Sequence, residues 1–226
     1  MKVGFFGKLP GYGDFIQRGV SPALVDTWDN WILQSFEVSR AHLGNAWKDT
    51  YFNSPIWRFT IDGKLLNGHS ISGIMMPSVD SAGRCYPFTV ICQAQRELNL
   101  FTLAATIDKL HENCEDFILS LLEKKRPDLD EITLLLQQTY EKLKDYKCSD
   151  IGVCDVKSGT ELCRLQGPEL PVFSASNESF LAKILSHKNI HMSLWSTTDS
   201  AHFSAQKRYY HGLPPVDVFS SMLKGE

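Results

Sequence analysis

The chain begins with a short apolar run followed by a glycine-rich loop. Val3, Phe5 and Phe6 predict a short buried strand. The loop at residues 7–13 contains three glycines, which reach positive φ at no steric cost, and Pro10, which fixes its own φ. We therefore expect a tightly shaped loop that either holds a ligand or is held by another part of the chain.

A long amphipathic helix is predicted next. Ser21 is suited to the N-cap and Pro22 to the first helical position. Apolar residues then recur at helical spacing from Ala23 to about His42, and Gly44 ends the pattern. The simplest interpretation of its tryptophans, at positions 28 and 31, is that they anchor the core, and an aromatic binding site is the alternative.

Strand patterns dominate the middle and the end of the chain. Residues 56–61, 70–76 and 87–94 predict strands, and residues 77–84 form a second loop rich in polar and turn residues. Residues 99–125 and 128–144 predict a helical hairpin. Further short elements are expected at residues 151–156 and 161–165 (strands), 176–187 (helix), 190–196 and 201–209 (strands), and 216–223 (helix).

This order of elements favours one α/β domain over residues 1–226. We expect a three-layer sandwich, with a mixed central sheet and helices on both faces. The helical hairpin at about 99–145 and an irregular region at about 145–170 would be parts of that single domain.

Composition narrows the classes of function. A net charge of −3 leaves no electrostatic footprint for nucleic acid or an anionic membrane. No targeting segment or stretch of about 18 apolar residues is visible, so we expect a cytoplasmic protein without membrane insertion. The six cysteines form no Cys-x-x-Cys pair, which favours reduced thiols over a metal site or a disulfide.

The sequence fits neither a phosphate-binding loop nor a nucleophilic serine. The segment Gly4 to Lys8 has the wrong glycine spacing for a phosphate-binding loop, and Leu9 stands where that loop needs a serine or threonine. Ser78 is not part of a Gly-x-Ser-x-Gly motif, and the scattered histidines place no base beside it. These patterns predict no catalytic residue, no cofactor and no metal ligand.

Charged residues in the two loops favour a structural network instead. Asp14 and Asp80, with Arg18, Arg58 and Arg84 as partners, would tie the first loop to the second through buried ion pairs. Replacing Asp14 or Arg84 by alanine would then destabilise the fold by about 1–3 kcal/mol, because a buried group would lose its partner.

Several motifs resemble a known family in the same order along the chain. The segment Gly4-Phe-Phe-Gly-Lys-Leu-Pro-Gly-Tyr-Gly-Asp-Phe15 is similar to the signature Gly-Phe-x-Gly-Lys-x-Pro-x-x-Gly-Asp-Phe. Further matches are Trp28-Asp-x-Trp31, residues 54–59, 73–88, 193–195 and 212–214. On these motifs the chain resembles the TagF family, also called ImpM, of type VI secretion-associated proteins. The resemblance is strong over residues 3–92 and weaker over 176–223.

The resemblance implies a cytoplasmic, non-enzymatic regulator that represses type VI secretion assembly after translation, through protein–protein contacts. Its partners would be type VI secretion components, including a forkhead-associated scaffold protein, Fha. The competing hypothesis is a small-ligand binder or an enzyme that uses the loops at 7–15 and 77–84. The candidates for interaction or for the loop network are Lys8, Asp14, Arg18, Trp28, Trp31, Trp57, Arg58, Ser78, Asp80 and Arg84.

Overall fold

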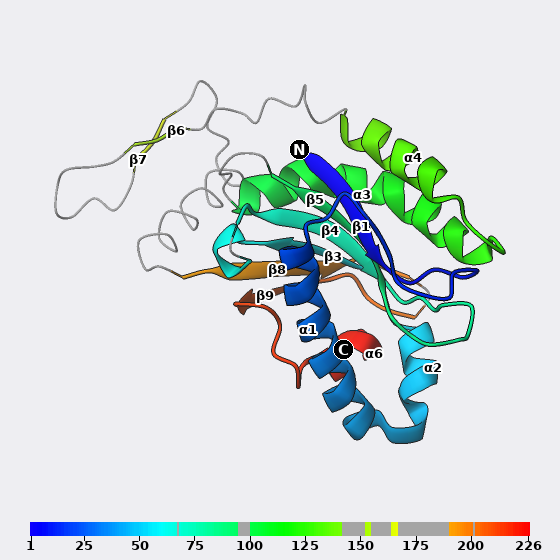
Figure 1. The fold of residues 1–226 in the computed structure, drawn as a ribbon. Coiled ribbons are helices and arrows are strands. Elements are labelled where there is room, and N and C mark those ends of the chain that lie inside the picture. The colour runs from blue at the N-terminus through cyan, green and yellow to red at the C-terminus, as the bar shows by residue number, and fades with distance from the viewer. Residues whose placement is uncertain (67, 95–99, 142–151, 155–163, 167–189, 201) are drawn as a thin grey trace.

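Seven strands form one antiparallel sheet at the centre of the molecule (Figure 1). The computed structural model describes the chain except for residues 67, 95–99, 142–151, 155–163, 167–189 and 201. The strand order is β2-β1-β5-β4-β3-β8-β9. The strands are β1 (Lys2–Gly7), β2 (Ile16–Arg18), β3 (Trp57–Ile61), β4 (Ile71–Met76), β5 (Phe88–Gln93), β8 (Met192–Thr197) and β9 (Gln206–His211).

The predicted α/β class is confirmed, but the expectation of a mixed sheet is wrong. Every neighbouring pair in the seven-stranded sheet is antiparallel. Short connections explain the pairs β3–β4, β4–β5 and β8–β9, since two parallel strands need a crossover of about a dozen residues or more. The described residues also include a two-stranded antiparallel pair, β6 (Gly152–Cys154) with β7 (Arg164–Gln166).

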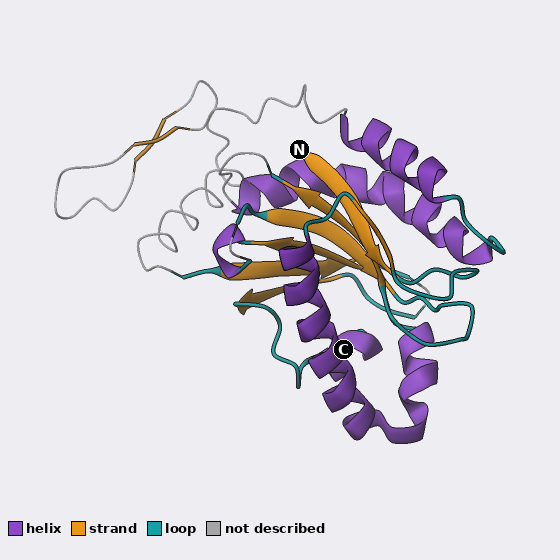
Figure 2. Ribbon diagram, viewed as in Figure 1, coloured by secondary structure: helices purple, strands orange, loops and turns teal. Residues whose placement is uncertain are grey.

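Helices pack on both faces of the sheet (Figure 2). One face carries α1 (Pro22–Leu43), α2 (Trp47–Phe52) and α6 (Phe219–Lys224), and the other carries α3 (Leu100–Glu123) and α4 (Leu129–Glu141). Side chains alternate along a strand, so Phe5 of β1 joins the α3–α4 cluster and Phe6 joins the α1 cluster. Two hydrophobic cores therefore fix the sheet from opposite sides.

The long first helix begins and ends as its sequence predicts. The Ser21 hydroxyl accepts a hydrogen bond from the backbone N–H of Leu24, and Pro22 lies in the first turn.

The structure places helices α3 and α4 at the predicted hairpin, whereas the helix expected at 176–187 lies outside the described residues. In the part of the chain that is described, no helix is long and apolar enough to cross a membrane.

Candidate functional site

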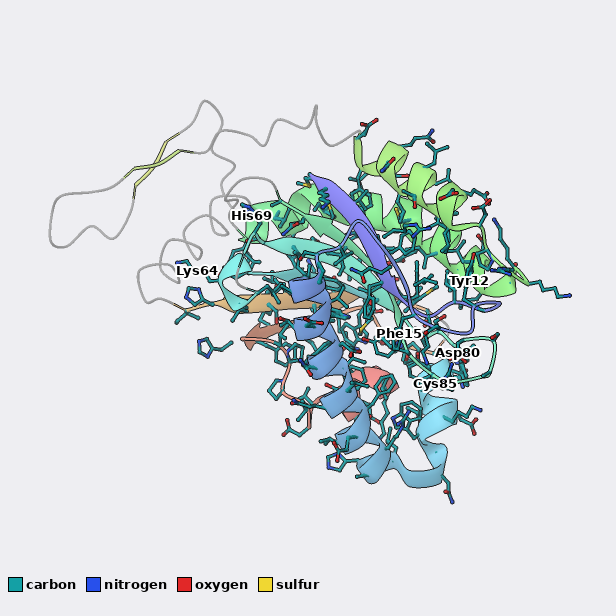
Figure 3. All side chains as sticks on the ribbon, in the orientation of Figure 1. Tyr12, Phe15, Lys64, His69, Asp80 and Cys85 are labelled. Atoms are coloured by element: carbon teal, nitrogen blue, oxygen red, sulfur yellow. The ribbon has the colours of Figure 1, made fainter. Side chains whose placement is uncertain are left out.

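Two loops meet at one end of the sheet. Strand β5 pairs with both β1 and β4 in antiparallel fashion, so the ends of β1 and β4 lie beside the start of β5. The loop after β1 (residues 8–15) therefore lies against the loop after β4 (residues 77–87). In Figure 3, Tyr12, Phe15, Asp80 and Cys85 gather at this end, away from Lys64 and His69.

A buried carboxylate holds the two loops together. The Lys8 ammonium donates to Asp80 Oδ2 at 3.0 Å, and the Arg84 Nε donates to the same oxygen at 2.6 Å. Asp80 Oδ1 accepts from the backbone N–H groups of Ala82 and Arg84, at 2.9 and 3.0 Å. The Asp80 side chain is 0% exposed, whereas that of Arg84 is 61% exposed. We call Lys8, Asp80 and Arg84 the Asp80 cluster.

The surroundings of Asp80 keep its carboxylate ionised. Burial by itself raises the pKa of this carboxyl group, but the hydrogen bonds from the Arg84 backbone, Lys8, the Arg84 guanidinium and the Ala82 backbone outweigh it. The net result is a pKa well below the usual range of an aspartate. Such a group is a weak base, and it is enclosed by its own donors.

Backbone contacts extend the link between the loops. The Ser78 hydroxyl donates to the Lys8 carbonyl at 2.7 Å, and the Ser81 N–H donates to the Tyr12 carbonyl at 2.8 Å. From α2, the Tyr51 hydroxyl donates to the Ser78 carbonyl and accepts from the Ser78 N–H, both at 2.8 Å. The second loop is thus fixed on one side by the first loop and on the other by α2.

The turn between α3 and α4 forms a third part of the site, which the sequence analysis missed. The Tyr12 hydroxyl donates to the Pro127 carbonyl at 2.6 Å, and the Arg126 guanidinium lies 4.9 Å from the centre of the Tyr12 ring. A Cβ atom at Gly11 would stand 2.2 Å from the Lys125 carbonyl oxygen. The glycine at position 11 was the available signal, because only glycine permits such a close backbone approach at a φ of +84°.

Two predicted members of the network lie outside it. Asp14 is exposed, and its carboxylate accepts from the neighbouring Phe15 N–H rather than from an arginine. Arg18 is exposed on β2. The predicted link between the loops therefore exists, but Asp80 and Lys8 form it in place of Asp14 and Arg18, because Asp80 lies inside the loop contact and Asp14 faces solvent.

The candidate tryptophans belong to the core. Trp28, Trp31 and Trp57 are 0%, 7% and 2% exposed. The indole N–H of Trp31 donates to the Pro214 carbonyl and that of Trp57 to the Met222 carbonyl, so the first ring ties the C-terminal segment to α1 and the second ties it to β3. Their placement excludes them from an exposed interaction surface.

Arg58 also takes part in a different contact from the predicted one. Its Nε donates to the Glu115 carboxylate of α3 at 2.5 Å, and both side chains are largely buried. This ion pair therefore links β3 to α3 and does not link the two loops.

The polar groups at the centre of the loop site are engaged in hydrogen bonds within the protein. The Asp80 carboxylate is enclosed, and the Ser78 hydroxyl is committed to a carbonyl. Within the described ranges, no group of three or more His, Cys, Asp or Glu side chains could hold a metal ion. The exposed side chains of the site include Arg84 and the Phe15 ring, which is 42% exposed.

Comparison with known families bears on this site directly. Residues 4–138 match the family model of the TagF N-terminal domain, described as type VI secretion system-associated. The chain belongs to the TagF family. The matched region contains the Asp80 cluster, Tyr12 and the α3–α4 turn, so every part of the loop site lies within the family domain.

A solved structure resembles the TagF chain over nearly its whole length. It is the crystal structure of PA0076 from Pseudomonas aeruginosa PAO1, which is 33% identical and has a TM-score of 0.76. The alignment covers 99% of this chain and 94% of that one. A search of curated protein sequences found no significant match.

Proposed function

We propose that this TagF-family protein is a non-enzymatic regulator that represses type VI secretion through protein–protein contacts in the cytoplasm. Two findings support the proposal. The family is type VI secretion system-associated. The loop site also presents a fixed surface. Asp80, the only buried carboxylate among the described loop residues, is enclosed by its own hydrogen-bond donors.

The preorganised Phe15 ring is the observation that carries the proposal. This ring stacks on Phe6 at 5.4 Å and meets the edge of Tyr86 at 4.7 Å, and the Lys8 ammonium lies 4.9 Å from its centre. It nevertheless remains 42% exposed. A half-exposed aromatic side chain that is already immobilised loses little entropy on binding, and such residues dominate the energetics of interfaces.

The proposed partners are components of the type VI secretion machinery, with a forkhead-associated scaffold protein, Fha, as the first to test. The proposed contact surface consists of residues 7–15 and 77–84, centred on Phe15 and Arg84. The regulator would bind its partner directly, and no chemical step is required.

A secretion assay tests this function. Deletion of the gene should raise type VI secretion, and the intact gene should restore repression. The variant Phe15→Ala should fold but fail to repress. Leu33→Ala is the matched control, because Leu33 is 51% exposed on α1, outside the loop site, and should repress normally.

The enzyme or ligand-binding hypothesis has its own test with the same two loops. A thermal-shift screen with nucleotides and divalent metals should leave the melting temperature unchanged, since a ligand that binds the folded state raises it by mass action. A reproducible shift that Asp80→Asn abolishes would contradict the proposal and favour a ligand site.

A further inference from the structure

An apolar groove lies beside the loop site. It has a volume of 310 Å³, and its walls come from α2, α3, the end of β4 and both loops. The side chains that decide its character are Phe52 of α2, Met76 of β4, and Leu119 and Leu122 of α3. The groove is therefore built where all the segments that shape the loop site converge.

The two side-chain hydroxyls that line the groove already donate their hydrogens within the protein. These hydroxyls belong to Ser54 and Ser78. The Ser54 hydroxyl donates to the Tyr51 carbonyl at 2.8 Å, and the Ser78 hydroxyl donates to the Lys8 carbonyl at 2.7 Å. Among the described residues that line the groove, none has a charged side chain. A polar ligand would leave its own groups unsatisfied there, so the groove suits an apolar occupant.

Two large apolar side chains of the groove remain exposed, one on α2 and one on α3. Phe52 and Leu119 are each 44% exposed, although both line the groove. An aromatic and an aliphatic side chain facing the same hollow gain free energy when a third apolar group displaces the water between them. Exposed apolar groups that converge in this way mark interaction sites on soluble proteins.

The size of the groove decides between a short segment and a second copy of the chain. Ten residues line it, whereas a stable interface between two proteins uses about 20–30 residues on each side. Its volume lies at the lower end of the range for pockets that enclose a small group, about 300–1,000 Å³. The groove thus fits one or two side chains of a partner rather than the face of another folded protomer.

We infer that the groove receives a bulky aliphatic or aromatic side chain, a leucine, methionine or phenylalanine, from a short segment of the type VI secretion partner. This inference rests on the proposed function and deepens it. Pro10 of the first loop and Ser78 and Val79 of the second loop line the groove, so it is continuous with the proposed contact surface.

Site-specific cross-linking tests the occupant. A photo-reactive benzoylphenylalanine replaces Leu119 in the full-length protein, and the partner segment that it captures in cells is identified by mass spectrometry. The same residue at Leu134 is the control, because Leu134 is 55% exposed on α4 and does not line the groove. A synthetic peptide with the captured sequence is then titrated against the purified protein.

We expect the captured segment to have a bulky apolar residue at its centre. Replacing that residue by alanine in the peptide should weaken binding about tenfold or more, as for other buried anchors. Leu119→Lys in the protein should weaken binding similarly and relieve repression, and Leu134→Lys should do neither. Should Leu119→Lys fail to fold, Phe52→Ala serves as the second groove variant.

Other outcomes separate the two proposals. If deletion of the gene raises secretion but the Leu119 and Phe52 variants repress normally, the groove inference fails and the proposed function stands. If deletion leaves secretion unchanged, the proposed function itself fails. Capture of a second copy of this chain, or of a segment whose apolar residue is dispensable for binding, would overturn the assignment of the occupant.

Discussion

At the scale of single residues, the stability of the loop site depends on which aspartate is buried. Asp80 has four hydrogen-bond donors and no exposure, whereas Asp14 is exposed. We expect Asp80→Asn to lower the free energy of unfolding by about 3 kcal/mol, because the buried Lys8 ammonium loses its partner. Asp14→Asn should change it by less than about 0.5 kcal/mol. Chemical denaturation measures both.

The pH dependence of the difference in free energy of unfolding between wild type and Asp80→Asn tests whether the Asp80 carboxylate is the source of that difference. The pKa of Asp80 is lowered in the folded protein, so its contribution to stability is complete above the unfolded pKa of about 3.9 and is lost as the pH falls below it. The difference between wild type and Asp80→Asn should be constant from pH 8 to 5 and shrink below about pH 4. A difference that stays constant through pH 3 would contradict this assignment.

Two glycines with similar φ values allow the energetic cost of a steric contact to be measured separately from that of backbone strain. Gly11 and Gly83 have φ values of +84° and +75°, but a Cβ atom at Gly83 meets nothing within 4 Å. Gly83→Ala should therefore cost about 1–2 kcal/mol from strain alone. Gly11→Ala should cost clearly more, because its Cβ would strike the Lys125 carbonyl oxygen. Equal losses in denaturation experiments would mean that the α3–α4 turn is not held against the first loop.

At the scale of secondary-structure elements, α1 is held by its buried aromatic face. Trp28 packs against Trp31, Phe59 and Trp195, with ring centres 4.8–6.1 Å apart. Trp28→Ala should lower the free energy of unfolding by about 3–5 kcal/mol, through the lost burial and the cavity left behind. Leu33→Ala on the exposed side of the same helix should stay within about 0.5 kcal/mol. A mild effect of Trp28→Ala would reopen the question of a binding role for this ring.

The loops acquire their shape from elements distant in the sequence. Tyr12 is linked to Pro127, and Tyr51 of α2 is linked to Ser78. Tyr12 makes one hydrogen bond to Pro127 and Tyr51 makes two to Ser78, in each case between segments that have no shared pattern in the sequence. The loop site is thus a meeting point of α2, the α3–α4 turn and two strand connections, which explains why its residues are dispersed over more than a hundred positions.

At the scale of the whole molecule, a buried histidine makes stability depend on pH. Burial, and then the positive charge of Arg58, lower the pKa of His111 to about 3. The unfolded histidine has a pKa of about 6.5, so between these values the unfolded chain binds a proton that the folded protein does not. Stability should therefore fall as the pH decreases from about 6.5, by up to about 1.4 kcal/mol per pH unit from this residue.

The lowered pKa of His111 is tested by the slope of the free energy of unfolding against pH, and not by its value at any one pH. His111→Gln should flatten the slope between pH 6 and 4 by about one proton, whatever its effect on stability at pH 7. Denaturation curves at half-unit pH intervals provide the measurement. Equal slopes for wild type and His111→Gln would contradict the lowered pKa.

The sequence by itself determined the elements that depend on local patterns. Apart from β2, which was not predicted, the strands, the first helix with its Ser21 cap and the two helices after β5 follow from apolar spacing and turn residues, which act within a few positions. The signature from Gly4 to Phe15 also indicated the family, and the family model matches residues 4–138. These features depend on residues that are close together in the sequence, so they can be predicted from the sequence alone.

Only the tertiary structure decided which side chains meet. Burial selected Asp80 over Asp14 as the carboxylate that holds the loops, and it decided for the core-anchor interpretation of Trp28 and Trp31 over the alternative of an aromatic binding site. The direction of each strand, and hence the antiparallel sheet, depends on how the connections pack, as does the position of the α3–α4 turn against Gly11. Such contacts join residues about 70–115 positions apart, and the physical reason they escape prediction is that no local pattern specifies a distant partner.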